Sequence, residues 1–76
     1  MNHDRRAAIR KVIDELADLR AQLEVLRDDE QDSFDNLPEG LKAAPNGQAS
    51  EAAVDALEAA VNGLEEAESS LNEAIG

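Results

Sequence analysis

The sequence predicts an all-α fold: an antiparallel hairpin of two long helices that pairs with a second hairpin to form a four-helix bundle. Apolar residues recur at steps of three and four over residues 4–34 and again over 47–75, the spacing of helices with one apolar face. Both prolines and two of the four glycines fall between these segments, in "DNLPEGLKAAPNG" at 35–47. With one Phe and no Trp or Tyr, the chain has little material for a compact core of its own.

The first helix is predicted over residues 4–34, where neither glycine nor proline interrupts the pattern. We use "seam" for the line of residues along which two helices meet. The predicted seam of this helix consists of Ile9, Val12, Leu16, Leu19, Leu23 and Leu26. Ile13 lies beside it, so the apolar stripe is broader than the contact with a single neighbouring helix requires.

The second helix is predicted over residues 47–75 from a seven-residue repeat, "EAAVDAL", "EAAVNGL", "EEAESSL". Its predicted seam consists of Val54, Leu57, Val61, Leu64, Leu71 and Ile75, with Glu68 at one seam position. Beside it runs a column of alanines, Ala53, Ala60, Ala67 and Ala74. Small residues there allow a neighbouring helix to approach closely. Gly63 costs about 1 kcal/mol against Ala in a helix, yet the register continues across it, so one helix is predicted.

A two-helix hairpin leaves part of each apolar face in water, and the wide first stripe and the alanine column favour pairing of two hairpins. The predicted self-association seam is Val12, Leu16, Leu19, Leu23, Leu26, Val54, Leu57, Val61, Leu64 and Leu71. A different partner protein could cover the same surface. Glu68 is expected opposite Leu16, within reach of Arg20 or of an arginine of a second subunit, where it fixes the register or extends to solvent.

Residues 35–46 are predicted to form the hinge. Asn36-Leu37-Pro38-Glu39 resembles the start of a helix, with a capping Asn and an acid three residues later, so a short helical turn is expected through about Ala43. Pro45 then redirects the chain into the second helix. The apolar residues of the hinge, expected to pack inward and close the end of the bundle, are Phe34, Leu37 and Leu41.

Charges form two clusters that are unfavourable in isolation, cations near the start of the first helix and acids near the end of the second. The cations are Arg5, Arg6, Arg10 and Lys11, and the acids are Glu65, Glu66, Glu68 and Glu73. An antiparallel hairpin places the clusters side by side, where each offsets the other. Two separately solvated charged faces are the alternative.

The opposite end of the hairpin is strongly acidic, with only Arg27 and Lys42 as nearby cations. We name the following residues the acidic tip and predict that they bind a partner: Asp28, Asp29, Asp32, Asp35 and Glu39. A purely solubilising surface is the commoner explanation for such a run.

The usual catalytic and metal-binding patterns are missing. There is no Cys, and the one His, His3, cannot supply the Glu-x-x-His pairs of a di-iron bundle. Asp28, Glu30 and Asp32 imitate the start of a calcium loop, but Ser33 replaces its turn glycine. The sequence therefore predicts no enzyme, no catalytic residue, no metal site and no cofactor.

The 76 residues predict one domain, and the chain shows neither the apolar core of a signal peptide nor a membrane-spanning run. A cytoplasmic protein without membrane contacts is expected. The net charge of −11 disfavours direct binding to nucleic acid, because phosphates would be repelled.

The hinge "EQDSFDNLPEGL" at 30–41, followed by "EAAVDALEAAVNGLEEA", resembles a group of small acidic helical-hairpin proteins of phages, prophages and other mobile elements. The resemblance covers residues from about 15 to 75, and the hinge is its specific part. It implies a mobile-element setting, in which small acidic proteins often bind a larger host or viral protein, and it brings no catalytic residue or ligand.

The sequence thus predicts a non-enzymatic protein-interaction module that forms a homodimer, with a basic host or viral protein as a further possible partner. The alternative function is an inhibitor that imitates nucleic acid and blocks a host defence protein, of anti-CRISPR or anti-restriction type, or another DNA-binding protein. The motive for the alternative is the high density of acids, which lie about 6 Å apart at i and i+4 of a helix.

Overall fold

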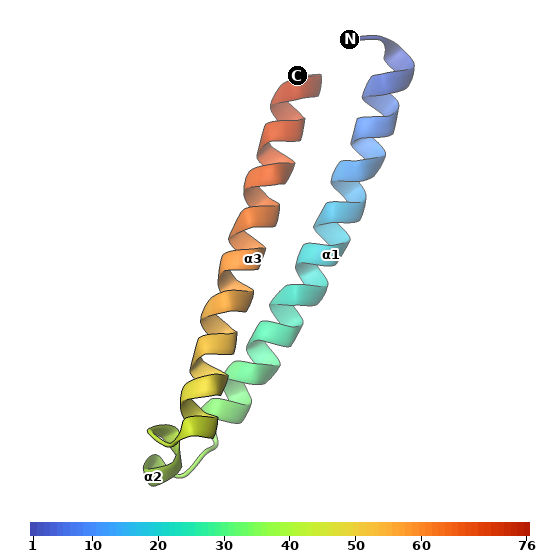
Figure 1. Ribbon diagram of the computed structural model, residues 1–76. Helices are drawn as coiled ribbons and strands as arrows, with labels where there is room; N and C mark the ends of the chain where they lie inside the picture. The colour runs from blue at the N-terminus through green and yellow to red at the C-terminus, as the bar shows by residue number, and fades with distance from the viewer.

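The protein is an antiparallel hairpin of two long helices, as a computed structural model of all residues, 1–76, shows. Helix α1 (His3–Asp35) lies alongside α3 (Pro45–Ile75), and the one-turn helix α2 (Glu39–Lys42) lies in the connection (Figure 1). The two termini lie together at the opposite end of the hairpin from α2. The predicted all-α hairpin is therefore confirmed, and its second helix begins two residues earlier than predicted.

The helix ends follow from local chemistry. The Asn2 side chain accepts a hydrogen bond from the Arg5 backbone N–H at 2.7 Å and so caps α1. Pro45 is the first residue of α3, where a missing N–H leaves no partner unsatisfied. Asn36 was expected to start a helix, but it ends α1 instead, and Pro38 directly precedes α2.

The closed end is a tight backbone contact between the connection and α3. Gly47 is buried, and a Cβ atom there would overlap the carbonyl oxygens of Leu41 and Lys42. Phe34 is half-buried, with Lys42 Nζ 5.8 Å from its ring centroid. Leu37 is also half-buried, but Leu41 is 52% exposed, so its predicted inward packing is wrong.

On α3 the predicted seam faces α1. Val54 and Val61 are only 8% and 2% exposed, and the other seam residues of this helix are half-buried. The half-buried residues of α1 that recur at alternating steps of four and three are Ile9, Ile13, Leu16, Arg20, Leu23, Arg27, Glu30 and Phe34. The seam of α1 therefore includes three charged residues.

The predicted seam of α1 meets α3 only at every second position, and the role of the other positions in self-association stays a prediction. Val12, Leu19 and Leu26 are 44%, 50% and 55% exposed and lie outside the contact with α3. The reason is that α3 contributes Glu68 and Ser50 to its seam, and these polar side chains require polar partners. Rotating α1 so that Arg20 and Glu30 meet them turns Val12, Leu19 and Leu26 toward solvent.

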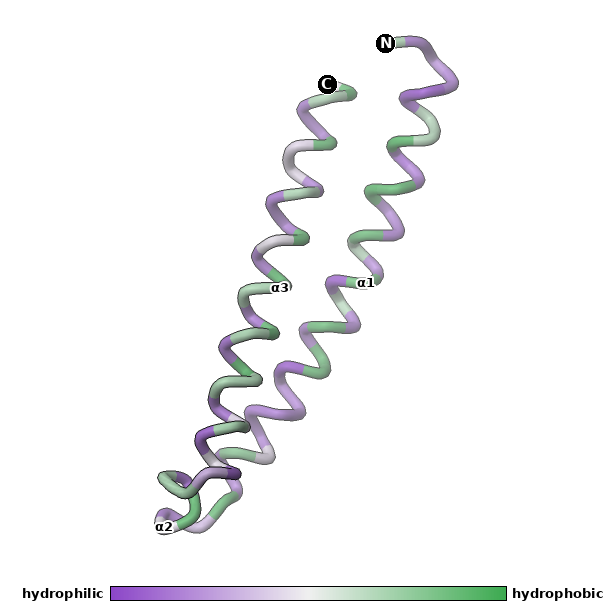
Figure 2. The backbone as a smooth tube through the Cα atoms, viewed as in Figure 1, coloured by the Kyte–Doolittle hydropathy of each residue, from purple (hydrophilic) through white to green (hydrophobic).

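The hairpin is a thin rod with very little interior. Its Cα radius of gyration is 17.2 Å, whereas a compact domain of this length has one of about 11 Å. Only two apolar residues are buried, and apolar positions recur along both helices (Figure 2). No helix combines the length and apolar character needed to cross a bilayer. Six large apolar residues are thus exposed and available to a neighbouring molecule: Met1, Val12, Leu19, Val25, Leu26 and Leu41.

Candidate functional site

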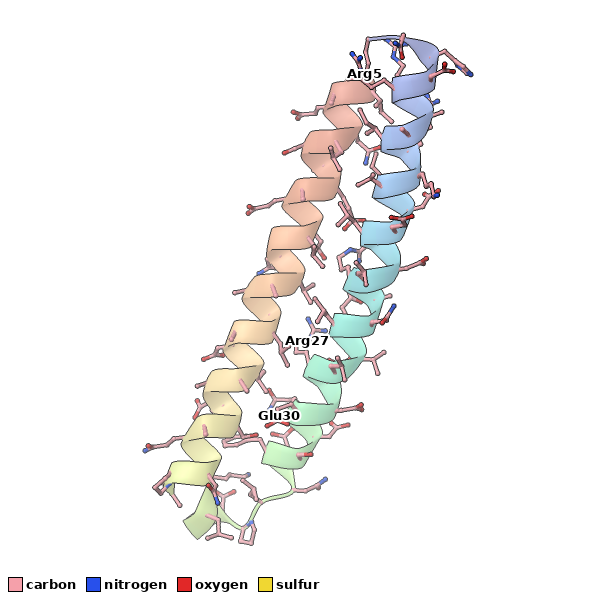
Figure 3. All side chains as sticks on the ribbon, turned by 45° about the vertical axis from the view of Figure 1, so that its right-hand side comes forward. Arg5, Arg27 and Glu30 are labelled. Atoms are coloured by element: carbon pink, nitrogen blue, oxygen red, sulfur yellow. The ribbon has the colours of Figure 1, made fainter.

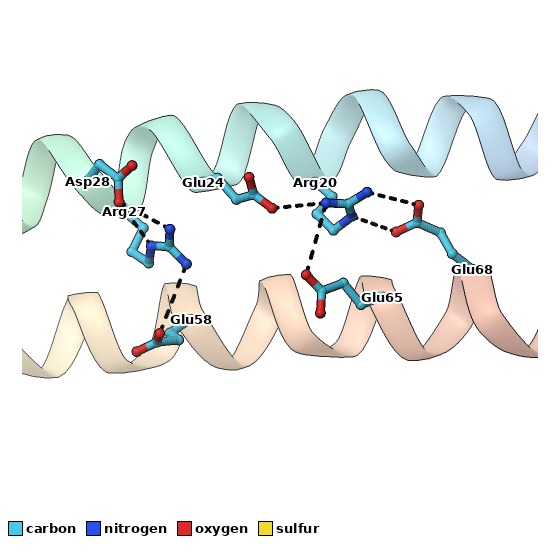
Figure 4. Close-up of polar contacts among 7 residues, drawn as sticks. All are labelled: Arg20, Glu24, Arg27, Asp28, Glu58, Glu65 and Glu68. Atoms are coloured by element: carbon cyan, nitrogen blue, oxygen red, sulfur yellow. Dashed lines mark hydrogen bonds and ion pairs between the residues drawn. The ribbon is translucent and has the colours of Figure 1, made fainter.

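The two broad sides of the hairpin, above and below the plane that contains α1 and α3, differ sharply in chemistry. Arg20 is at the centre of one side (Figure 4). Its Nε donates to Glu68 Oε2 at 2.8 Å and its Nη1 donates to Glu24 Oε1 at 3.0 Å, while Glu65 Oε1 lies 4.0 Å from Nη1. The expectation that Glu68 reaches Arg20 is confirmed.

Glu68 is well shielded for a carboxylate, with a side chain only 13% exposed, and Arg20 supplies its counter-charge. The hydrogen bonds that Arg20 donates, first to Glu68 and then to Glu24, raise the pKa of Arg20 above its ordinary value. Arg20 therefore stays charged, and the seam contains a permanent polar layer between Leu16 and Leu23.

Two more polar contacts cross the seam nearer the closed end. Arg27 lies between the helices, 3.1 Å from Asp28 and 4.0 Å from Glu58 (Figure 4). Ser50 Oγ donates to Glu30 Oε1 at 2.6 Å, and Figure 3 shows Glu30 in the same interhelical space. The sequence analysis did not identify this contact, because a serine in an alanine-rich helix carries no signal of its own.

The Arg20–Glu68 layer allows a direct test by substitution. Glu68→Leu is expected to raise the Tm by about 5 °C, because leucine at this shielded position needs no counter-charge, while Arg20 is 29% exposed and keeps its ion pair with Glu24. Arg20→Ala is expected to lower the Tm, because Glu68 loses its partner. Thermal melts followed by circular dichroism at one protein concentration measure both shifts, and a lower Tm for Glu68→Leu contradicts this account of the layer.

The positions of these acids define what we name the charged side. Glu24 follows Leu23 by one residue on α1, and Glu65 follows Leu64 by one residue on α3. Each is therefore turned by about 100° from its seam in the same sense. Because Arg20 contacts both, the two flanks lie on one side of the hairpin.

The residues one position before each seam residue are turned by about 100° from the seam in the opposite sense. They therefore lie on the other broad side of the hairpin. On α1 these are the exposed Val12, Leu19 and Leu26, which alternate with the exposed residues Ala8, Glu15, Gln22, Asp29 and Ser33. On α3 they are the alanines of the predicted column, of which only Ala53 is half-buried. The alanines thus do not serve the contact with α1.

Every position along this flank of α3 is small. We name the following the small-residue row: Ala49, Ala53, Ala56, Ala60, Gly63, Ala67, Ser70 and Ala74. Its steps alternate between four and three, as in a second seam. Together with Val12, Leu19 and Leu26 it forms what we name the apolar side. The sequence revealed half of the row, the alanine column, but not that both rows share one side.

The charge clusters are compensated differently from what the sequence suggested. At the acidic tip, Asp28 pairs with Arg27 and Glu39 with Lys42, each at 3.1 Å, and Asp35 accepts a hydrogen bond from Gln31. The side chains of Asp29 and Asp32 have no partner in the chain. At the open end, no salt bridge joins the basic cluster, which includes Arg5 (Figure 3), to the acids of α3. The two clusters thus lie toward the same end of the hairpin (Figure 1), as expected, but they form no salt bridges with each other.

The surface contains no cleft or cavity, and no group of His, Cys, Asp or Glu side chains is arranged to hold a metal ion. No protein-family model matches the chain, and no curated protein or solved structure is significantly similar to it. The resemblance of the hinge to mobile-element proteins stays a prediction. The apolar side is thus the feature that most needs a functional explanation.

Proposed function

We propose that this chain is a non-enzymatic protein-interaction module that self-associates through its apolar side. The observation that supports the proposal is the one-sided distribution of side chains: ion pairs line the charged side, while exposed Val12, Leu19 and Leu26 and the small-residue row line the other. A lone hairpin gains nothing from an exposed row of large aliphatic residues.

The size of the side fits this role. The Cα trace extends 58 × 15 Å across the broad face, which corresponds to about 870 Å². A standard protein interface buries about 800 Å² on each partner. Two hairpins stacked on this face form a four-helix bundle, whose interior then includes the residues that are now exposed.

The dependence of stability on concentration tests the proposal, because association stabilises a folded dimer by mass action. A hundred-fold increase in protein concentration is expected to add about 2.7 kcal/mol and to raise the Tm by roughly 10 °C. Circular dichroism melts across that range measure the shift. A Tm that is independent of concentration contradicts self-association.

A second candidate function, an inhibitor that imitates nucleic acid, is supported by the unpaired acids. Six of the 18 acidic residues take part in salt bridges, which leaves 12 without a cation. Such a protein should displace duplex DNA from a basic host protein at low ionic strength and lose this effect at high ionic strength. Failure to compete with DNA at low ionic strength excludes this candidate.

A further inference from the structure

We propose that the second copy lies antiparallel on the apolar side, related by a two-fold axis that passes close to Leu19 and Gly63. The inference rests on the proposed function, which leaves the orientation of the two copies open. Three separate features of the hairpin support it: the centring of the two rows, the unpaired charges of α1, and a glycine that the hairpin itself does not need.

The two rows of the apolar side have a common centre. Val12 and Leu26 lie seven residues to either side of Leu19, and the alanine column is centred between Ala60 and Ala67, close to Gly63. These centres lie at nearly the same height along the rod, because Arg20, next to Leu19, contacts Glu65. One two-fold axis at this height therefore places each row of one hairpin against the same row of the second hairpin.

In this arrangement the surface is self-complementary, as a two-fold interface requires. Leu19 meets Leu19 of the second copy, and Val12 meets Leu26. The small-residue row packs on itself, so the two α3 helices approach closely while the bulkier α1 rows fill the remaining space. Each helix is then antiparallel to both neighbours, the arrangement of an up-down four-helix bundle.

Four charged side chains of α1 all find partners together only in this orientation. Arg5 and Lys11 lie 14 and 8 residues before Leu19, and Asp29 and Asp32 lie 10 and 13 residues after it. None of the four makes a salt bridge within the chain.

Arg5 continues the exposed row of α1, and the other three lie on the flank of that row that faces away from α3. An antiparallel copy places Arg5 near Asp32 and Lys11 near Asp29 of the second copy. A parallel two-fold copy on the same side stacks α1 on α3 of the second copy, which has no Lys or Arg, so Asp29 and Asp32 find no cation there. Charge complementarity therefore favours the antiparallel orientation.

Gly63 is unexplained by the hairpin alone. A Cβ atom added there meets nothing within 4 Å, and glycine is the poorest helix former after proline. At the centre of a contact between two α3 helices, the missing side chain permits the closest approach of the backbones. The proposed axis thus gives this glycine a role.

Overall charge opposes the assembly, because each copy carries a net charge of −11. In addition, the Asp18 residues of the two copies lie near each other at the axis. The apolar side must therefore supply the driving force. Added salt is expected to strengthen the dimer, since it screens the net repulsion more than it weakens the few local pairs.

A pair of charge-reversal variants tests the orientation. The first carries Asp29→Lys and Asp32→Lys, and the second carries Arg5→Glu and Lys11→Glu. In an antiparallel dimer each variant alone sets like charges against each other, so each homodimer is expected to weaken at least about tenfold. An equimolar mixture restores both sets of pairs as a heterodimer. Sedimentation equilibrium of each variant and of the mixture measures the three affinities.

The outcomes separate this inference from the function on which it rests. Homodimers as tight as the parent, or a mixture no tighter than its components, overturn the antiparallel arrangement while self-association stands. If the parent protein is monomeric, the proposed function itself is wrong. Net charge cannot imitate the expected result, because the first variant is less acidic than the parent and is still expected to dissociate.

Gly63→Leu tests the axis by a second route. Leucine favours a helix over glycine and meets no atom of the lone hairpin, so a hairpin without the proposed contact is stabilised. In the proposed dimer the new side chain separates the two α3 helices and weakens association at least tenfold. Asn62→Leu, which points away from the apolar side, is the matched control. Unchanged association of Gly63→Leu overturns the placement of the axis.

Discussion

Leu19→Asp is expected to convert the protein into a monomer. In the proposed assembly Leu19 packs on its own copy at the two-fold axis, so one substitution removes two buried leucines and brings two carboxylates together. Burial of a leucine contributes about 1.5–3 kcal/mol, so the pair accounts for a loss of affinity of roughly a hundredfold to ten-thousandfold. Sedimentation of the parent and the variant at equal concentration measures the effect.

Ala21→Asp is the matched control for this experiment. Ala21 is an exposed apolar residue of α1, and it is turned by about 160° from Leu19, toward the charged side. The same change of chemistry there should leave the dimer intact. If both variants dissociate equally, the effect reflects added charge and not a specific surface, and the assignment of the apolar side fails.

Gly47→Ala is expected to give the largest loss of folding stability of any methyl-sized change in the chain. The new Cβ overlaps two backbone carbonyl oxygens, those of Leu41 and Lys42, which cannot move aside without displacing α2. Overpacking of this kind costs up to about 3 kcal/mol. A chain of this length has a total stability of roughly 4–11 kcal/mol. Urea unfolding followed by circular dichroism measures the difference.

Gly40→Ala provides the comparison for Gly47→Ala. Gly40 lies in α2 with nothing within 4 Å of an added Cβ, so alanine there should leave stability unchanged or raise it slightly. A Gly47→Ala variant as stable as Gly40→Ala would mean that the connection does not pack against α3 as described.

The features that the sequence predicted correctly are those with a strong periodic signal. The seven-residue repeat after residue 50 gave the seam of α3, including the polar interruption at Glu68 and its distance to Arg20. The prolines and glycines gave the hinge, because Pro45 can begin a helix but cannot continue one. The antiparallel hairpin followed from these elements and the short connection.

The phase of α1 could not be obtained in the same way. Ile9, Leu16 and Leu23 belong to two overlapping stripes, one that continues through Val12 and Leu19 and one that continues through Ile13 and Arg20. A hydrophobic pattern selects the first stripe, because the second contains charges. The structure follows the second, because a half-buried Glu68 needs a counter-charge more than the hairpin needs another leucine.

The candidate site was predictable only in part for the same reason. The alanine column and the width of the α1 stripe both indicated a further contact, but whether they share one side depends on the phase of α1. The sequence shows that the basic cluster of α1 and the acidic cluster of α3 lie close together in a hairpin. Whether they form ion pairs depends on how far each side chain reaches, which the sequence does not show. Arg27 and Lys42 pair with acids of the acidic tip, and Arg5 pairs with none.

Sedimentation equilibrium of the unmodified protein tests most directly whether a second copy covers the apolar side. We expect a mass twice the 8.2 kDa of the chain at micromolar concentration and above, with a dimer that strengthens as salt is added. A fully helical species that keeps the mass of one chain at every concentration and salt level would contradict it.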